Sequence, residues 1–144
     1  MMPDRARIEQ LVPHAGAMCL LDAVTQWDEA RITCSSHEPG ASHPLARDGM
    51  VPAIAAAEYA AQATAVHGAL VDGAGQPRAG MLAKLMDVDL HSACFPPQSG
   101  SVTVSATLLS RSGGGCLYAF EVGCRSQPIA SGRLIVAFPP SAAP

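Results

Sequence analysis

The middle of the chain holds one long alanine-rich stretch, VPAIAAAEYAAQATAVHGALV from Val51 to Val71, which restricts the possible folds more than any other segment. Alanine has the highest helix propensity, and Pro52 suits a first helical turn, where a missing N–H costs nothing. Gly68 and the run Asp72-Gly73-Ala74-Gly75 should end the helix. Because apolar residues lie on nearly every side, we predict a buried helix at the centre of the fold.

Two polar side chains stand out within this predicted helix. Glu58 and Gln62 are four positions apart and therefore share one face. A carboxylate surrounded by alanine is costly to bury and poorly solvated, which favours its protonated form. Something must therefore stabilise Glu58, and the pair is the first indication of a functional site.

The rest of the chain carries mostly strand patterns. From Ser101 to Leu108 apolar and polar residues alternate, which indicates a strand with one dry and one wet face. Gly113-Gly114-Gly115 and Gln127-Pro128 predict turns between later strands. We expect consecutive strands to form an antiparallel meander that wraps its dry face around the long central helix, an α+β fold. The other expected elements are a short helix at Asp4–Leu11 capped by Asp4, and strands at Met18–Trp27, Ala30–Ser36, Met81–Leu90, Ser101–Leu108, Cys116–Val122 and Ala130–Phe138.

Length and charge narrow the class of protein. The 144 residues suit one domain, placed at residues 1–138, with a disordered tail at 139–144. A net charge of −3 with 15% charged residues argues against a nucleic-acid binder. The hydrophobic fraction of 49% is high for a small monomer and indicates apolar surface that a second chain covers.

The sequence predicts neither a metal site nor a cofactor. The five cysteines have no metal-binding spacing, and no three of the five histidines do. The N-terminus lacks an apolar export signal, and the central helix is too short and too interrupted to cross a bilayer. We therefore expect a cytoplasmic protein with reduced thiols and no contact with a membrane.

Several motifs resemble the hotdog-fold 3-hydroxyacyl-acyl-carrier-protein dehydratases of fatty-acid synthesis. Leu11-Val12-Pro13-His14, followed by Leu20-Leu21-Asp22-Ala23-Val24, is similar to the family's Leu-Pro-His…Leu-Val-Asp segment. His43, then Met50-Val51-Pro52-Ala53, then Glu58-Tyr59-Ala60-Ala61-Gln62 is similar to His-Phe-Pro-Gly…Met-Pro-Gly…Glu-Ala-x-Ala-Gln. The resemblance covers nearly the whole chain and implies a hotdog fold, an antiparallel sheet wrapped around one central helix.

The match departs from the family pattern around His43. The segment from His43 to Pro52 is one residue longer than the usual loop, and Ala53 stands where the family has Gly. This version resembles a divergent branch, the accessory dehydratases of aryl polyene gene clusters. Members of that branch look like partners of a second hotdog subunit.

The resemblance also implies a reaction, the dehydration of a 3-hydroxyacyl thioester on an acyl carrier protein to the 2-enoyl thioester. His43 is implied as the base that takes the C2 proton, and a histidine suits this role because it titrates near neutral pH. Glu58 is implied as the acid, or as the group that positions the leaving hydroxyl. Pro52, Ala53 and Gln62 are implied as substrate-binding residues, with a free amide near Ala53 facing the thioester carbonyl as negative charge develops there.

In this family the histidine and the acidic residue of one site come from different protomers. The resemblance therefore implies a homodimer, or a heterodimer with another hotdog subunit, whose sheets join edge to edge along Met81–Leu90. Two alternatives stay open. The chain could be an acyl thioesterase that uses Glu58 and a water molecule, or a catalytically silent partner in which His43 merely hydrogen-bonds the start of the helix.

Overall fold

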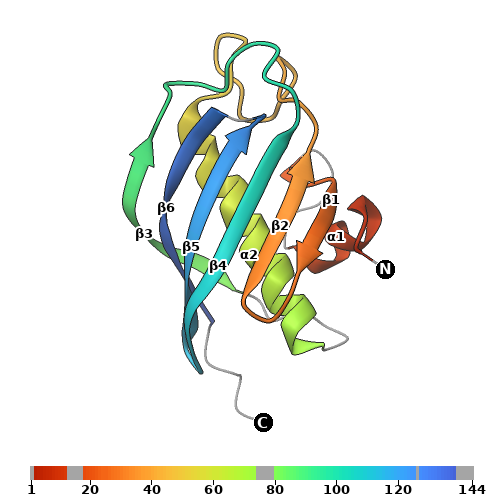
Figure 1. Cartoon of the computed structure of the whole chain (residues 1–144), viewed down its shortest axis with the longest axis vertical. Helices are drawn as coiled ribbons and strands as arrows, with labels where there is room; N and C mark the ends of the chain where they lie inside the picture. The colour runs from red at the N-terminus through yellow and green to blue at the C-terminus, as the bar shows by residue number, and fades with distance from the viewer. Residues whose placement is uncertain (1, 13–17, 74–79, 126, 139–144) are drawn as a thin grey trace.

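The computed structural model describes residues 2–12, 18–73, 80–125 and 127–138. One curved six-stranded antiparallel sheet wraps around a single long helix, α2, and the short helix α1 lies beside β1 (Figure 1). The fold expected from the sequence is therefore confirmed. The elements in chain order are α1 (Arg5–Leu11), β1 (Ala23–Trp27), β2 (Arg31–Ser36), the 3₁₀ turn η2 (Ala53–Ala55), α2 (Ala56–Asp72), β3 (Met81–Leu90), β4 (Val102–Ser112), β5 (Gly115–Cys124) and β6 (Gln127–Ala137).

The central helix begins later than predicted and ends within one residue of the predicted end. The α-helix starts at Ala56, after the 3₁₀ turn η2, and not at Val51; it passes through Gly68 without a break and ends at Asp72. Gly73 follows with φ +62°, and its N–H donates to the Ala69 carbonyl at 3.1 Å. Glycine caps a helix this way because it adopts the left-handed conformation without strain. Ten of the 17 residues of α2 are buried, as a helix enclosed by a sheet requires.

The order of strands in the sheet is β1-β2-β4-β5-β6-β3. The expected simple meander is therefore wrong in one respect, because β3 and β4 follow each other in the chain but are not neighbours in the sheet. After α2 the chain enters the far edge of the sheet, where β3 pairs with β6, and β4 then returns to pair with β2. An intervening helix allows this jump, since it carries the chain across the whole sheet.

The alternation in β4 is confirmed: Val102, Val104 and Ala106 are buried against α2, whereas Thr103 is exposed. Two boundaries differ from the prediction. β1 begins at Ala23 rather than at Met18, and the expected turn at Gln127-Pro128 lies inside β6. The chain reverses before Gln127, where Arg125 has φ +53°. Pro128 is tolerated in this strand because it pairs at a register shift next to Gly123.

Some sequence-based predictions fall outside the described residues, namely those on Pro13, His14, Ala74, Gly75 and the tail at 139–144. Among the residues that the structure describes, no helix is long and apolar enough to cross a membrane. The described part of the chain also contains no cluster of three potential metal-binding side chains.

Candidate active site

A largely apolar groove of about 420 Å³ runs along α2. Glu58, Gln62, Ala65 and Ala69 line it at intervals of three to four residues, because one face of the helix forms its floor. From Glu58 to Asp72 this face spans about 21 Å at 1.5 Å per residue. The opposite walls come from α1 and from the strands β3, β5 and β6, through Leu11, Val12, Met81, Leu82, Cys116, Tyr118, Val136 and Phe138.

Glu58 lies in this groove and is half-buried. Its Oε1 accepts a hydrogen bond from Nε2 of Gln62 at 2.9 Å. The predicted shared face is therefore confirmed, but the expectation of a deeply buried carboxylate is wrong. The groove opens part of the helix surface at this point, so Glu58 can be reached by a molecule bound there.

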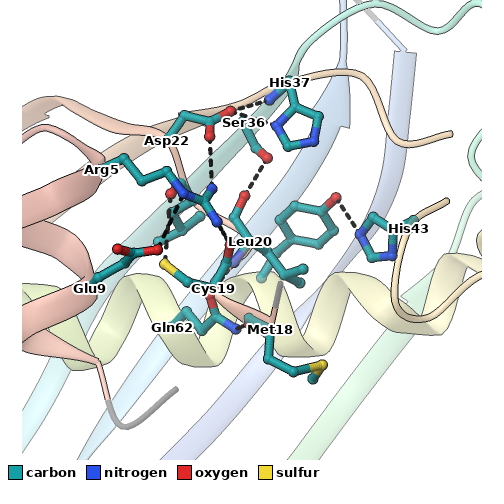
Figure 2. Close-up of polar contacts among 12 residues, drawn as sticks. Arg5, Glu9, Met18, Cys19, Leu20, Asp22, Ser36, His37, His43 and Gln62 are labelled. Atoms are coloured by element: carbon teal, nitrogen blue, oxygen red, sulfur yellow. Dashed lines mark hydrogen bonds and ion pairs between the residues drawn. The ribbon is translucent and has the colours of Figure 1, made fainter. Parts of the chain in front are cut away.

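Gln62 is a fixed hydrogen-bonding residue with only 2% of its surface exposed. Its Oε1 accepts the N–H of Leu20 at 2.8 Å, and its Nε2 donates to the Met18 carbonyl at 2.7 Å (Figure 2). The same Nε2 also donates to Glu58. The amide thus ties the segment before β1 to α2. The Leu20 N–H is thereby used by a side chain and not by the sheet, and β1 begins three residues later, at Ala23.

His43 lies on the loop before α2 and is half-buried (Figure 2). The backbone N–H of Leu45 donates to its Nδ1 at 3.0 Å, and its Nε2 lies 3.1 Å from the hydroxyl of Tyr59. Burial lowers the pKa of His43, and the neighbouring His37 lowers it further. The imidazole is therefore neutral at neutral pH.

The structure does not bring His43 and Glu58 into one cavity within a single chain. His43 contacts Tyr59, whereas Glu58 faces the groove, and adjacent residues on a helix point about 100° apart. His43 is not among the described residues that line the groove. Within one chain the two side chains therefore lie on different faces of α2 and its preceding loop.

The predicted free amide at Ala53 is wrong. The N–H of Ala53 donates to the Ala93 carbonyl at 2.9 Å, and the side chain is fully buried. Pro52 forms an isolated bridge with Cys94, and Phe95 donates its N–H to Val51. This short pairing holds the start of the helix against the loop before β4, so the Ala53 amide is not available to a substrate carbonyl.

The sequence matches a family described as ApeP-like, ApeP dehydratase, over residues 6–144. The chain belongs to the ApeP-like dehydratase family. No curated protein matches it significantly.

Several solved structures share the fold of this ApeP-like chain. The dehydratase heterocomplex ApeI:P from Xenorhabdus doucetiae matches with a TM-score of 0.78 and 22% identity, over 93% of this chain and 91% of that chain. A mutant of thioesterase PA1618 from Pseudomonas aeruginosa matches with a TM-score of 0.68 and 15% identity, over 94% and 93%. Thioesterase HI1161 from Haemophilus influenzae matches with a TM-score of 0.67 and 13% identity, over 95% and 91%. At these identities the likenesses show a common fold.

The structure adds one residue to the site that the sequence reasoning missed. Tyr59 is 1% exposed, and its ring lies between those of His43 and Phe95, with centroid distances of 5.9 and 5.7 Å. Burial raises its pKa to about 12, although a hydrogen bond with Ser36 opposes part of the rise. A signal was present, because the quoted dehydratase pattern has Ala at the position of Tyr59.

A second cluster surrounds Asp22, in the motif that resembles Leu-Val-Asp. Burial alone would raise the pKa of Asp22, but hydrogen bonds from His37 and Arg5 outweigh it and lower the pKa. Asp22 accepts from the His37 backbone N–H at 2.6 Å and from Arg5 at 2.9 Å (Figure 2). The cluster ties α1 to the end of β2, from which the His43 loop departs.

His67 is a fully buried core residue, and both of its ring nitrogens have hydrogen-bond partners. It lies 2.7 Å from the Tyr118 hydroxyl and 2.8 Å from the Asp28 carbonyl. Since a carbonyl can only accept, Nε2 of His67 carries the proton and Nδ1 accepts from Tyr118. This pair links α2 to β5 at the wall of the groove.

Proposed function

We propose that this chain is a subunit of a hotdog dehydratase that converts 3-hydroxyacyl thioesters on an acyl carrier protein to 2-enoyl thioesters. Membership of a dehydratase family supports the reaction class. The observation that carries the assignment to a site is the position of Glu58, a carboxyl group held by Gln62 in an apolar groove.

The reaction needs two protein groups. An imidazole takes a proton from C2, and the electron pair of that C–H bond forms the C2–C3 double bond. The C3–O bond breaks, and its oxygen leaves as water after taking a proton from Glu58. The imidazolium and the carboxylate then exchange their proton through solvent, which restores both groups.

The groove supports an acyl substrate. Its volume falls within the range of roughly 300–1,000 Å³ that is typical of small-molecule sites. Its walls are mostly apolar, so burial of a hydrocarbon chain along α2 is favourable by about 25 cal/mol per Å². Glu58 lies toward the N-terminal end of the groove and Asp72 at the other, so an acyl chain can extend away from the carboxyl group.

The imidazole that serves Glu58 comes from a second subunit in this proposal, since the two groups do not meet within one chain. That second subunit is another hotdog chain, either a second copy of this chain or a different protein of the same fold. The structural likeness to the dehydratase heterocomplex from Xenorhabdus doucetiae supports a partner subunit. The exposed edge strand β3, with Met81 66% and Leu82 41% exposed, is the candidate pairing surface.

The test is the variant Glu58→Gln in whichever purified species, the chain alone or its complex, converts a 3-hydroxyacyl thioester to the enoyl product. Loss of the proton donor should lower the rate by about 10²–10⁴-fold. Glu29→Gln, at an exposed position in the β1–β2 turn, is the matched control and should leave the rate unchanged. A rate within about threefold of wild type for Glu58→Gln would contradict the proposal.

A thioesterase remains the second candidate, because known thioesterases share the fold at TM-scores of 0.67 and 0.68. The two reactions are separated by their products, since hydrolysis releases a free thiol and dehydration does not. Thiol release from acyl carrier protein or coenzyme A thioesters, without enoyl product, would favour the thioesterase. Inertness of the chain in every complex would favour a silent structural partner.

A further inference from the structure

The hydrogen bonds around His43 run in one direction. Leu45 donates its backbone N–H to Nδ1 of His43 at 3.0 Å, and Nε2 lies 3.1 Å from the Tyr59 hydroxyl. The Leu45 end of this arrangement is a backbone group with a fixed role, because an amide N–H can only donate.

The Leu45 amide decides where the proton of His43 sits. Because Nδ1 accepts from Leu45, it carries no proton, and a neutral imidazole must then carry its proton on Nε2. With its proton on Nε2, His43 donates to the Tyr59 hydroxyl, which accepts. The lone pair on Nδ1 is thus occupied by the backbone, and Nε2 has no lone pair to offer. His43 is a hydrogen-bond donor in this arrangement and cannot accept a proton from a substrate.

The surroundings of Tyr59 hold this arrangement in place. The ring is 1% exposed and packs against the buried ring of Phe95, so the hydroxyl cannot turn away without moving the core. Phe95 is itself fixed through its N–H to Val51 at the start of the helix. A protonated His43 would also place an N–H against the N–H of Leu45, which disfavours the charged ring.

We infer that Tyr59 and the Leu45 amide hold His43 in a donor form that is not a base, so that the base facing Glu58 belongs to a different hotdog chain. Tyr59 is thereby a positioning residue that acts on His43. This inference rests on the proposed function and deepens it. A pair of this chain with such a partner has one working site, formed by Glu58 and the partner's imidazole, instead of two.

The first experiment measures the tautomer directly. The chain labelled with ¹⁵N-histidine is observed at about pH 7.5 by ring ¹⁵N–¹H spectra, where the two nitrogens of a neutral ring differ widely in shift. His43, assigned by its absence in His43→Gln, should show a protonated Nε2 and an unprotonated Nδ1. In Tyr59→Phe the Nε2 proton should exchange faster with water, since its acceptor is gone. An Nδ1-protonated ring or a mixture of tautomers in the wild type would overturn the inference.

The second experiment measures turnover with the chain alone and with the complex it forms with a second hotdog subunit. His43→Gln is the informative variant, because its amide can accept from Leu45 and donate to Tyr59 but cannot act as a base. The chain alone should be inert, and the complex carrying His43→Gln should keep its rate within about threefold of wild type, whereas loss of a base lowers rates by about 10²–10⁴-fold.

The outcomes separate the two proposals. Activity of the chain alone, or a loss of at least about 100-fold in the folded His43→Gln complex, would overturn the inference and leave the dehydratase assignment intact. Absence of any enoyl product from the wild-type complex would overturn the proposed function, while the ring spectra would still decide the protonation of His43. A folded state of the variant is verified by circular dichroism and by recovery of the complex.

Discussion

Replacing Gln62 tests whether this residue holds the fold together or takes part in chemistry. In Gln62→Ala, three hydrogen bonds disappear: those to Leu20, Met18 and Glu58. The amide N–H of Leu20 lies in a buried environment and would lose its partner. Gln62→Leu removes the same hydrogen bonds while keeping most of the side-chain volume, so it separates hydrogen bonding from cavity formation.

The magnitude follows from the number of bonds. Each intramolecular hydrogen bond contributes about 0.5–1.5 kcal/mol, and a buried donor left unpaired costs about 1–3 kcal/mol. Together these values predict a loss of about 3 kcal/mol in the free energy of unfolding for Gln62→Ala. For a domain of this size, that corresponds to a fall of roughly 6–12 °C in Tm. Gln62→Leu should lose about as much, because the hydrogen bonds dominate.

Urea denaturation followed by circular dichroism measures this change, with the linear extrapolation giving each free energy. Gln10→Ala, an exposed glutamine on α1, is the matched control and should change the free energy by less than about 0.5 kcal/mol. A loss below about 1 kcal/mol in both Gln62 variants would refute the reasoning. It would mean that water replaces the amide and that the segment before β1 is not held by it.

Three further predictions concern the core and the hairpin. Burial lowers the pKa of His67, so below about pH 6.5 the unfolded chain binds a proton that the folded chain does not bind. The free energy of unfolding should therefore be fully present above that pH and fall below it by up to about 1.4 kcal/mol per pH unit. A urea midpoint that does not change from about pH 7.5 to about pH 5 would contradict this prediction. Tyr118→Phe removes the hydrogen-bond donor to Nδ1 of His67 and should lower the free energy of unfolding by about 1–3 kcal/mol, measured by thermal denaturation. A change below about 0.5 kcal/mol would show that the hydroxyl is not needed for stability. Gly115→Ala places a Cβ against the Val136 carbonyl oxygen and should lower the free energy of unfolding by more than about 1 kcal/mol. The control Gly114→Ala has open space around the new Cβ and should change the free energy of unfolding by less than about 0.5 kcal/mol. Equal urea midpoints for the two variants would contradict this prediction.

The parts of the fold that follow from short-range patterns could be predicted from the sequence. Val102, Val104 and Ala106 alternate with polar residues, and that period of two belongs to the strand itself. The position of β3 could not be predicted in the same way. Whether β3 pairs with β4, as a meander requires, or with β6 depends on how α2 spans the sheet, which no local pattern encodes.

The same distinction holds at the candidate site. Glu58 and Gln62 were paired correctly because residues four apart on a helix are neighbours. The other partners of Gln62 lie 42 and 44 residues away, so its role as a tie to the segment before β1 was not visible. The amide of Ala53 was expected to be free for a similar reason, since its acceptor, Ala93, comes from a distant loop.

The proton on His43 could not be predicted from the sequence either. Leu45 is only two residues away, but its N–H reaches Nδ1 because the loop turns at this point, where Ala46 donates its N–H to the His43 carbonyl. Tyr59 reaches Nε2 because the loop lies against α2. A motif match identifies the residue type at a position. It does not specify which nitrogen carries the hydrogen.

The unpaired backbone of β3 has a consequence for any measurement of this protein. A chain that docks on that edge binds the folded form and not the unfolded one, so it raises the apparent stability by mass action as its concentration increases. For a complex formed along this edge, the melting temperature would depend on the ratio of the two subunits, and dilution would lower it.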